Sequence, residues 1–233
     1  APLLALREAA DAKAGTPGAL PAEARGLAYQ LCEHFGSLDR HHATLPPDER
    51  AAMRALRPLG VKFARRSIYL PQLLRPDAAS LLALLWGVQN KLDKIPPPPP
   101  PGITSFEPDR ETPQGFLAAA GFRLVGTRAV RLDMLDRLEE ELCNAAAKGE
   151  TADVVLTKLV SLLGSDRSSM DAVLAKLGWS RVDVAGETPV TVWRKAGAAK
   201  KPRHHRHKPK PREEPANPNS PFAGLKALMG AGR

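Results

Sequence analysis

Six consecutive prolines, Pro96–Pro101, constrain this 233-residue chain more than any other feature of its sequence. Each proline lacks a backbone N–H and fixes φ, so neither a helix nor a central strand can pass through the run. The run predicts a stiff polyproline extension of roughly 3 Å per residue. We expect a spacer between two packed units; the alternative is a ligand for an aromatic-lined groove of another protein.

Helical patterns dominate the sequence before the prolines. Alanine and leucine are common and aromatic residues make up only 5% of the chain, which favours helices over sheets. Apolar spacing predicts helices over 3–13, 21–36, 47–56 and 78–91. The last of these, which contains LLALLWGV, has so little polar face that we expect it to be buried centrally. Alternating apolar residues predict two short strands, or one bent strand, within 60–71.

The sequence after the prolines predicts a winged helix. We expect a strand at Gly121–Thr127, helices over 131–148, 151–163 and 168–177, and a hairpin of strands 179–184 and 189–194. Ser168 and Asp171 have the spacing of a capping box at the start of the third helix. In a winged helix the third helix and the hairpin can lie against nucleic acid. Because this third helix offers mainly small side chains, we expect backbone contact or scaffolding rather than base reading.

These patterns predict a mainly α protein with small β parts. The expected parts are a helical accessory domain with a short β-hairpin at 1–93, a Pro-rich linker at 94–114, a winged-helix-like domain at 115–195 and a disordered basic tail at 196–233. Near its end the tail has Phe222, Leu225, Leu228 and Met229 at helical spacing, which predicts a short docking helix. The chain starts at Ala1 and enters helical sequence at once, which is expected of an excised part of a longer protein and equally of a protein that has lost its first Met.

The positive charge is concentrated in two places. The chain has 34 Lys and Arg against 25 Asp and Glu, a formal excess of +9. Residues 194–212 carry nine of the basic residues and no acid, while 1–193 are balanced. Within the balanced part, residues 50–75 hold seven basic residues and no acid. We expect nucleic acid to be the partner of the tail, with a membrane surface second.

The stretch GVKFARRSIYLP, residues 60–71, carries the candidate phosphate contacts of the body. Its basic groups either form a solvated strand face or bind a phosphate backbone, and the lack of local acids favours phosphate, which suits the guanidinium fork. The expected nucleic-acid-binding residues are Lys62, Arg65, Arg66, Arg167, Lys176, Arg181, Arg194, Lys200, Lys201, Arg203, Arg206, Lys208, Lys210 and Arg212.

No motif for catalysis is present in the sequence. A phosphate loop, GxGxxG and GxSxG are all missing, so we expect no catalytic residue. The histidines at 41–42 and 204–207 have no further ligands at useful spacing, so we expect no metal site. Cys32 and Cys143 are far apart and predict reduced thiols of a cytoplasmic protein. The longest apolar stretch, Leu81–Val88, is far below the roughly 20 residues that span a bilayer.

Several blocks of the sequence carry a resemblance to a known family. They are RGLAYQLCEHFG, LGVKFARRSIYLPQLLRPDAASLLALLWGV, the Pro-rich stretch, GFRLVGTRAVRLDMLDRLEEEL, LVSLLGSDRSSMDAVLAKLGW and the basic tail ending in SPFAGLKAL. In this order the blocks resemble the C-terminal portion of alphaproteobacterial superfamily-two helicases, relatives of the mitochondrial degradosome RNA helicase. The most specific parts are Gly60–Leu74 and Arg128–Leu135.

The resemblance implies an ATP-driven motor of two RecA-like domains that acts on RNA or DNA. ATP and Mg²⁺ would be cofactors of that motor, whose residues would lie upstream of this chain. The chain would then be an accessory region that engages nucleic acid, with the motor domains and a ribonuclease or another protein as partners. The alternative is a stand-alone winged-helix module, without a motor, that binds nucleic acid or docks on a protein.

Overall fold

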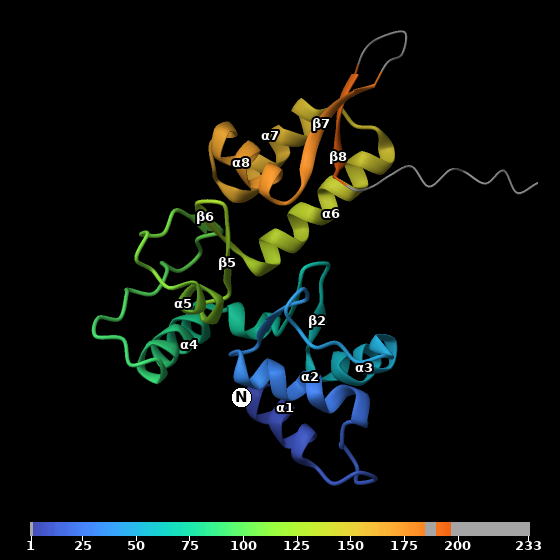
Figure 1. Cartoon of the computed structure of the whole chain (residues 1–233), viewed down its shortest axis with the longest axis vertical. Helices are drawn as coiled ribbons and strands as arrows, with labels where there is room; N and C mark the ends of the chain where they lie inside the picture. The colour runs from blue at the N-terminus through green and yellow to red at the C-terminus, as the bar shows by residue number, and fades with distance from the viewer. Residues whose placement is uncertain (1, 185–189, 197–233) are drawn as a thin grey trace, which may run out of the picture. The chain divides into compact units, whose positions relative to one another are not determined.

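The computed structural model describes residues 2–184 and 190–196. In the first part of the chain, helices pack around a small antiparallel sheet. The helices are α1 (Pro2–Asp11), α2 (Ala22–Glu33), α3 (Glu49–Leu56) and α4 (Pro76–Gln89), with short 3₁₀ segments η1 (Arg57–Leu59) and η2 (Pro71–Leu74) (Figure 1). Strands β1 (Ser37–Asp39), β2 (Lys62–Phe63) and β3 (Ser67–Tyr69) pair in the order β1-β3-β2. The core side chains include Leu6, Leu27, Leu31, Leu56 and Ile68. The four expected helices are confirmed to within three residues.

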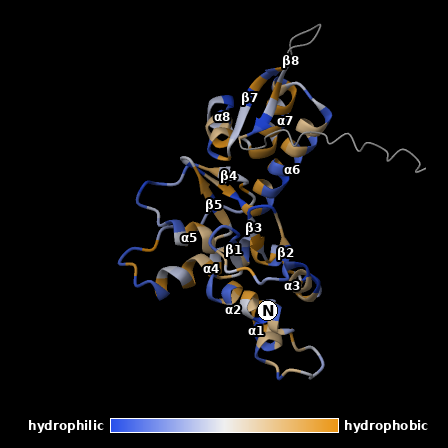
Figure 2. Ribbon diagram, turned by 45° about the vertical axis from the view of Figure 1, so that its right-hand side comes forward, coloured by the Kyte–Doolittle hydropathy of each residue, from blue (hydrophilic) through white to orange (hydrophobic). Residues whose placement is uncertain are grey.

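Helix α4 is not buried centrally, and that expectation is wrong. Its inner side is buried through Ala79, Leu82, Ala83 and Gly87. Its outer side exposes Leu81, Leu84, Leu85 and Val88 to solvent. The ribbon of α4 includes many residues in the colour of hydrophobic side chains (Figure 2). An apolar composition cannot distinguish a helix that is covered on every side from one with an uncovered second face. No helix among the described residues is long and apolar enough to cross a bilayer.

The segment around the prolines packs against its neighbours instead of only separating them. Strands β4 (Ser105–Phe106), β5 (Phe122–Val125) and β6 (Arg128–Arg131) form a second sheet in the order β4-β6-β5, next to α5 (Gln114–Ala119). Ile95 and Ile103, on either side of the proline run, pack in one cluster with Trp86 and Phe116. The range 94–114 therefore contributes a strand and apolar anchors, and the prolines do not divide the compact unit that spans Ala1–Ala196.

The last described part has the order of a winged helix. It contains α6 (Leu132–Lys148), α7 (Ala152–Leu163), α8 (Arg167–Lys176) and the hairpin β7 (Trp179–Val184) and β8 (Val190–Lys195). Thr151, between α6 and α7, forms an isolated bridge with Val192 of β8 and supplies the third strand position. The strand expected at 121–127 does not have this role, because β5 pairs with β6 in the second sheet.

Helix α8 begins at Arg167, one residue before the expected range of 168–177. Asp166 is the N-cap: its carboxylate accepts from the Ser169 backbone N–H at 2.9 Å and from the Ser168 hydroxyl. These hydrogen bonds hold the pKa of Asp166 well below its usual range. The predicted box between Ser168 and Asp171 is wrong, because the preceding aspartate takes the cap and Asp171 instead binds Arg181.

Candidate nucleic-acid interface

The stretch 60–71 forms two paired strands and a tight turn. Lys62 of β2 lies opposite Tyr69 and Phe63 lies opposite Ile68 of β3, which is the central strand of its sheet. Ala64 donates its N–H to the Ser67 carbonyl at 2.8 Å and closes the turn that carries Arg65 and Arg66. The pairing buries β3, whereas Lys62 and Arg65 are exposed.

Lys62 is bound to a carboxylate of α6. Its Nζ lies 2.6 Å from Asp136 Oδ2 and 5.9 Å from the ring centroid of Tyr69. The hydrogen bond to Asp136 raises the pKa of Lys62, so the amine is charged at neutral pH. One of the N–H donors of the Lys62 ammonium group is thus directed to Asp136, which leaves fewer donors for a phosphate.

Arg66 is the most enclosed of the three basic groups. Its Nε donates to Glu139 of α6, and its second terminal nitrogen donates to the Leu177 carbonyl at 2.7 Å. The Glu139 side chain is 1% exposed, and Lys195 Nζ approaches the same carboxylate to 3.6 Å. Arg66 thus joins the turn of the first sheet to α6 and to the end of α8.

These contacts show that residues 60–71 have acidic neighbours in the fold, although the sequence suggested none. Acids are missing near residues 60–71 along the sequence, but α6 brings Glu139 from 73 positions further on. Lys62 and Arg66 each form an ion pair with a carboxylate of α6. Arg65 is exposed and makes no ion pair within residues 2–184 and 190–196, so it remains a candidate for phosphate contact.

A better candidate surface lies on α3 and on its C-cap residue Arg57, the first residue of η1. Arg50, Arg54 and Arg57 are exposed and follow one another at i, i+4 and i+7, while Ala52 and Leu56 on the opposite side are buried. In the described part of the chain none of the three arginines forms an ion pair or a side-chain hydrogen bond. We call this set the arginine stripe. Residues three and four apart in a helix lie on one face, so the stripe presents three guanidinium groups in a row.

Arg40 connects the arginine stripe to the turn of residues 60–71. One of its terminal nitrogens donates to the Ala64 carbonyl at 3.2 Å, and the other pairs with Glu49 at the start of α3. Arg40 thus links the residue before Arg65 to the residue before Arg50. Glu49 is the acid in the first turn of α3, and its pairing with Arg40 partly neutralises it.

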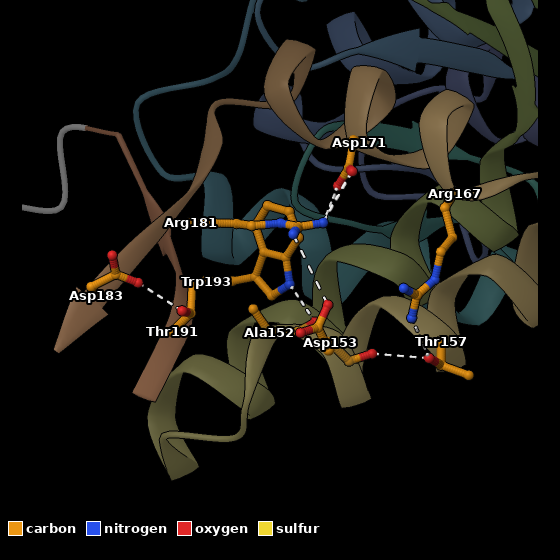
Figure 3. A network of polar contacts seen from close by, with 9 residues as sticks. All are labelled: Ala152, Asp153, Thr157, Arg167, Asp171, Arg181, Asp183, Thr191 and Trp193. Atoms are coloured by element: carbon orange, nitrogen blue, oxygen red, sulfur yellow. Dashed lines mark hydrogen bonds and ion pairs between the residues drawn. The ribbon is translucent and has the colours of Figure 1, made fainter. Parts of the chain in front are cut away.

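In the winged helix, Arg181 is part of a structural network (Figure 3). It binds both carboxylate oxygens of Asp171 at 2.9 and 3.0 Å and lies 5.2 Å over the ring of Trp193. Trp193 in turn donates its indole N–H to the Ala152 carbonyl at 3.1 Å. Arg181 thus joins the hairpin to α8, and its guanidinium is already bound by Asp171 and covered on one side by Trp193.

The remaining cations of this part differ in how available they are. Arg167 donates to the Thr157 hydroxyl at 3.2 Å, whereas Lys176 and Arg194 are exposed without an ion pair in the described segments. Two separate cations make a weaker electrostatic surface than three arginines on one helix face. The basic residues expected at 200–212 lie outside the described residues.

The sequence contains a signal for the arginine stripe, because Arg50, Arg54 and Arg57 have the i, i+4, i+7 spacing of one helix face. Within the described ranges no group of three or more His, Cys, Asp or Glu side chains is placed to hold a metal ion. The histidines at 204–207 lie outside those ranges.

Comparison of the chain with protein-family models, with curated proteins and with solved structures finds no match. The helicase resemblance therefore remains a prediction from the sequence blocks alone.

Proposed function

We propose that this chain engages the phosphate backbone of RNA or DNA as the C-terminal accessory region of an ATP-dependent helicase. The motor, with its ATP and Mg²⁺, would belong to the parent protein and not to these residues. The observation that carries the nucleic-acid part is the arginine stripe, three exposed guanidinium groups on α3 and its C-cap residue without acidic partners in the described chain. The helicase part rests on the sequence resemblance.

The stripe is suited to phosphates and not to base edges. Guanidinium forks bind phosphate oxygens in a bidentate manner, and the rise of about 1.5 Å per helical residue places neighbouring stripe members roughly 4.5–6 Å apart along the axis. A row of this kind follows a backbone without reading its sequence. The basic residues at 194–212 would add sequence-independent attraction and a faster association rate.

A winged helix that binds nucleic acid without a motor is the second candidate. The exposed Lys176 at the end of α8 and Arg194 on the hairpin favour it. In this case the Lys176→Ala, Arg194→Ala double variant would lose more affinity than the stripe variant. Reading the gene upstream of the Ala1 codon tests the helicase part, because an open frame with a phosphate loop supports it and a promoter with a start codon contradicts it.

The binding experiment compares single-stranded RNA affinity of the full chain with that of an Arg50→Ala, Arg54→Ala, Arg57→Ala variant. We expect the variant to bind about tenfold more weakly or worse at low salt, since it loses up to three phosphate contacts. The fold should survive, because all three side chains are exposed and unpaired in the described chain.

A matched control removes the same charge elsewhere. Lys13, Lys94 and Arg110 are also exposed and make no ion pair within the described residues. Their triple alanine variant has the same net charge as the stripe variant, so it reports the general electrostatic effect. Equal losses in the two variants would mean that the stripe is an ordinary solvated face.

A further inference from the structure

The outer side of α4 carries an uncovered apolar row. Leu81, Leu84, Leu85 and Val88 are 57%, 41%, 47% and 66% exposed. They follow one another at i, i+3, i+4 and i+7, so they form a continuous row over two helical turns, which we call the α4 seam. A contiguous exposed apolar row of this kind is a candidate interaction surface.

The spacing of the α4 seam fits another helix. Apolar residues three and four apart form the ridges and holes that a second helix fills, as in coiled coils. A lipid surface fits less well, since interfacial helices combine one apolar face with a basic polar face. The opposite side of α4 is not polar: it is buried in the protein through Ala79, Leu82, Ala83 and Gly87.

We propose that the α4 seam is the interface of a symmetric dimer, in which α4 packs antiparallel against α4 of a second copy of this chain. A two-fold interface must be self-complementary, and an apolar row is complementary to itself. The other exposed large apolar side chains in the described part, Leu4, Val154 and Val184, lie singly on three different elements. No second apolar row is therefore offered to the seam by that part of the chain.

Charges at the two ends of the seam select the antiparallel orientation. Asp77 lies four residues before Leu81, and Lys91 lies three residues after Val88, just beyond the C-cap residue Asn90. Both are exposed and without an ion pair in the described ranges. Antiparallel packing centred near Leu84 places Asp77 beside the partner subunit's Lys91 at both ends. Parallel packing would place like charges together, and it would also align the helix dipoles.

The seam is small, so the dimer is expected to be reversible, with a dissociation constant between about 1 μM and about 1 mM. Sedimentation equilibrium of the nuclease-treated full chain measures this dissociation constant. We expect Leu81→Glu to abolish the dimer, because it places a charge in the interface. Leu4→Glu is the matched control, since Leu4 on α1 is similarly exposed at 61%, and it should dimerise like the wild type.

Charge reversal tests the orientation. Asp77→Lys and Lys91→Asp should each weaken the dimer about three- to tenfold, because symmetry places each altered pair twice. The double variant should restore the wild-type constant. A chain that is monomeric at millimolar concentration, or a dimer unaffected by Leu81→Glu, would overturn the proposal. Two other results would also overturn the proposal. One is a monomeric chain that binds lipid vesicles and loses this binding on Leu81→Glu. The other is a dimer that is abolished by Leu225→Glu in the C-terminal segment.

Discussion

Replacing Arg66 should destabilise the protein rather than impair its binding to nucleic acid. The Arg66 side chain is 23% exposed, but the Glu139 side chain to which it donates is 1% exposed. Arg66→Met leaves this carboxylate buried with only Lys195, 3.6 Å away, as a remaining cation. Removing one partner of a buried ion pair typically costs 3–5 kcal/mol, and the partial compensation by Lys195 lowers our expectation to about 2–4 kcal/mol.

Replacing the other partner of the pair, Glu139, should lower the free energy of unfolding by less. Glu139→Leu leaves Arg66 with its hydrogen bond to the Leu177 carbonyl and with access to water. The double variant removes both charges and should recover most of the loss, because apolar replacement of a buried pair is often nearly neutral. We therefore expect a coupling free energy of about 1.5–3 kcal/mol between Arg66 and Glu139.

Denaturant unfolding followed by circular dichroism, at low and high salt, measures this cycle. The coupling should change little with salt, because the pair is enclosed. The pair of Arg181 and Asp171, whose side chains are 39% and 45% exposed, is the internal comparison. Its coupling free energy should be less than about 1 kcal/mol and should decrease as the salt concentration rises. If Arg66→Met costs under about 0.5 kcal/mol, Arg66 is a surface residue and the reasoning fails.

Three further substitutions test single residues. Gly115→Ala should destabilise the protein by about 1–3 kcal/mol although alanine favours helices, because its Cβ would lie 2.2 Å from the Trp86 ring. Gly26→Ala in α2 has nothing within 4 Å and should stabilise by about 0.5–1 kcal/mol, and urea unfolding of both variants decides the sign. Asp166→Asn keeps an acceptor at the N-cap of α8 but cannot titrate. Since the folded pKa of Asp166 is depressed, its ionised form stabilises above the ordinary value of 3.8 and this contribution is lost as the pH falls. The Tm difference between wild type and Asp166→Asn should therefore narrow or reverse between about pH 7 and about pH 3, and a constant difference would contradict the assigned cap.

Local patterns predicted the helices and the hairpin, because their causes lie within a few residues. The apolar spacing of α2 and α6 and the glycines that follow α6 and α7 fix those elements locally. The strand position at Thr151 is a single residue and has no periodicity to detect. The same holds for β4, whose two residues pair with a strand that follows more than twenty residues later.

The candidate site was harder to predict because it depends on pairing across the chain. Nothing near Lys62 or Arg66 in the sequence indicates that α6 supplies carboxylates to both. Whether a basic side chain is available to a phosphate is decided by such distant partners. The arginine stripe was predictable in principle, since its spacing and the buried Ala52 and Leu56 lie within one helix. The exposure of the α4 seam was not, because composition does not show which face the rest of the protein covers.

The salt dependence of single-stranded RNA binding tests the central claim most directly. For a single strand, each phosphate contact contributes about 0.7 to the slope of log affinity against log salt concentration. Between about 50 and 200 mM salt, the Arg50→Ala, Arg54→Ala, Arg57→Ala variant should have a slope about 2 units shallower than the wild type, and Arg66→Met should match the wild type while folded. An unchanged slope for the stripe variant, or a shallower one for Arg66→Met, would contradict the account.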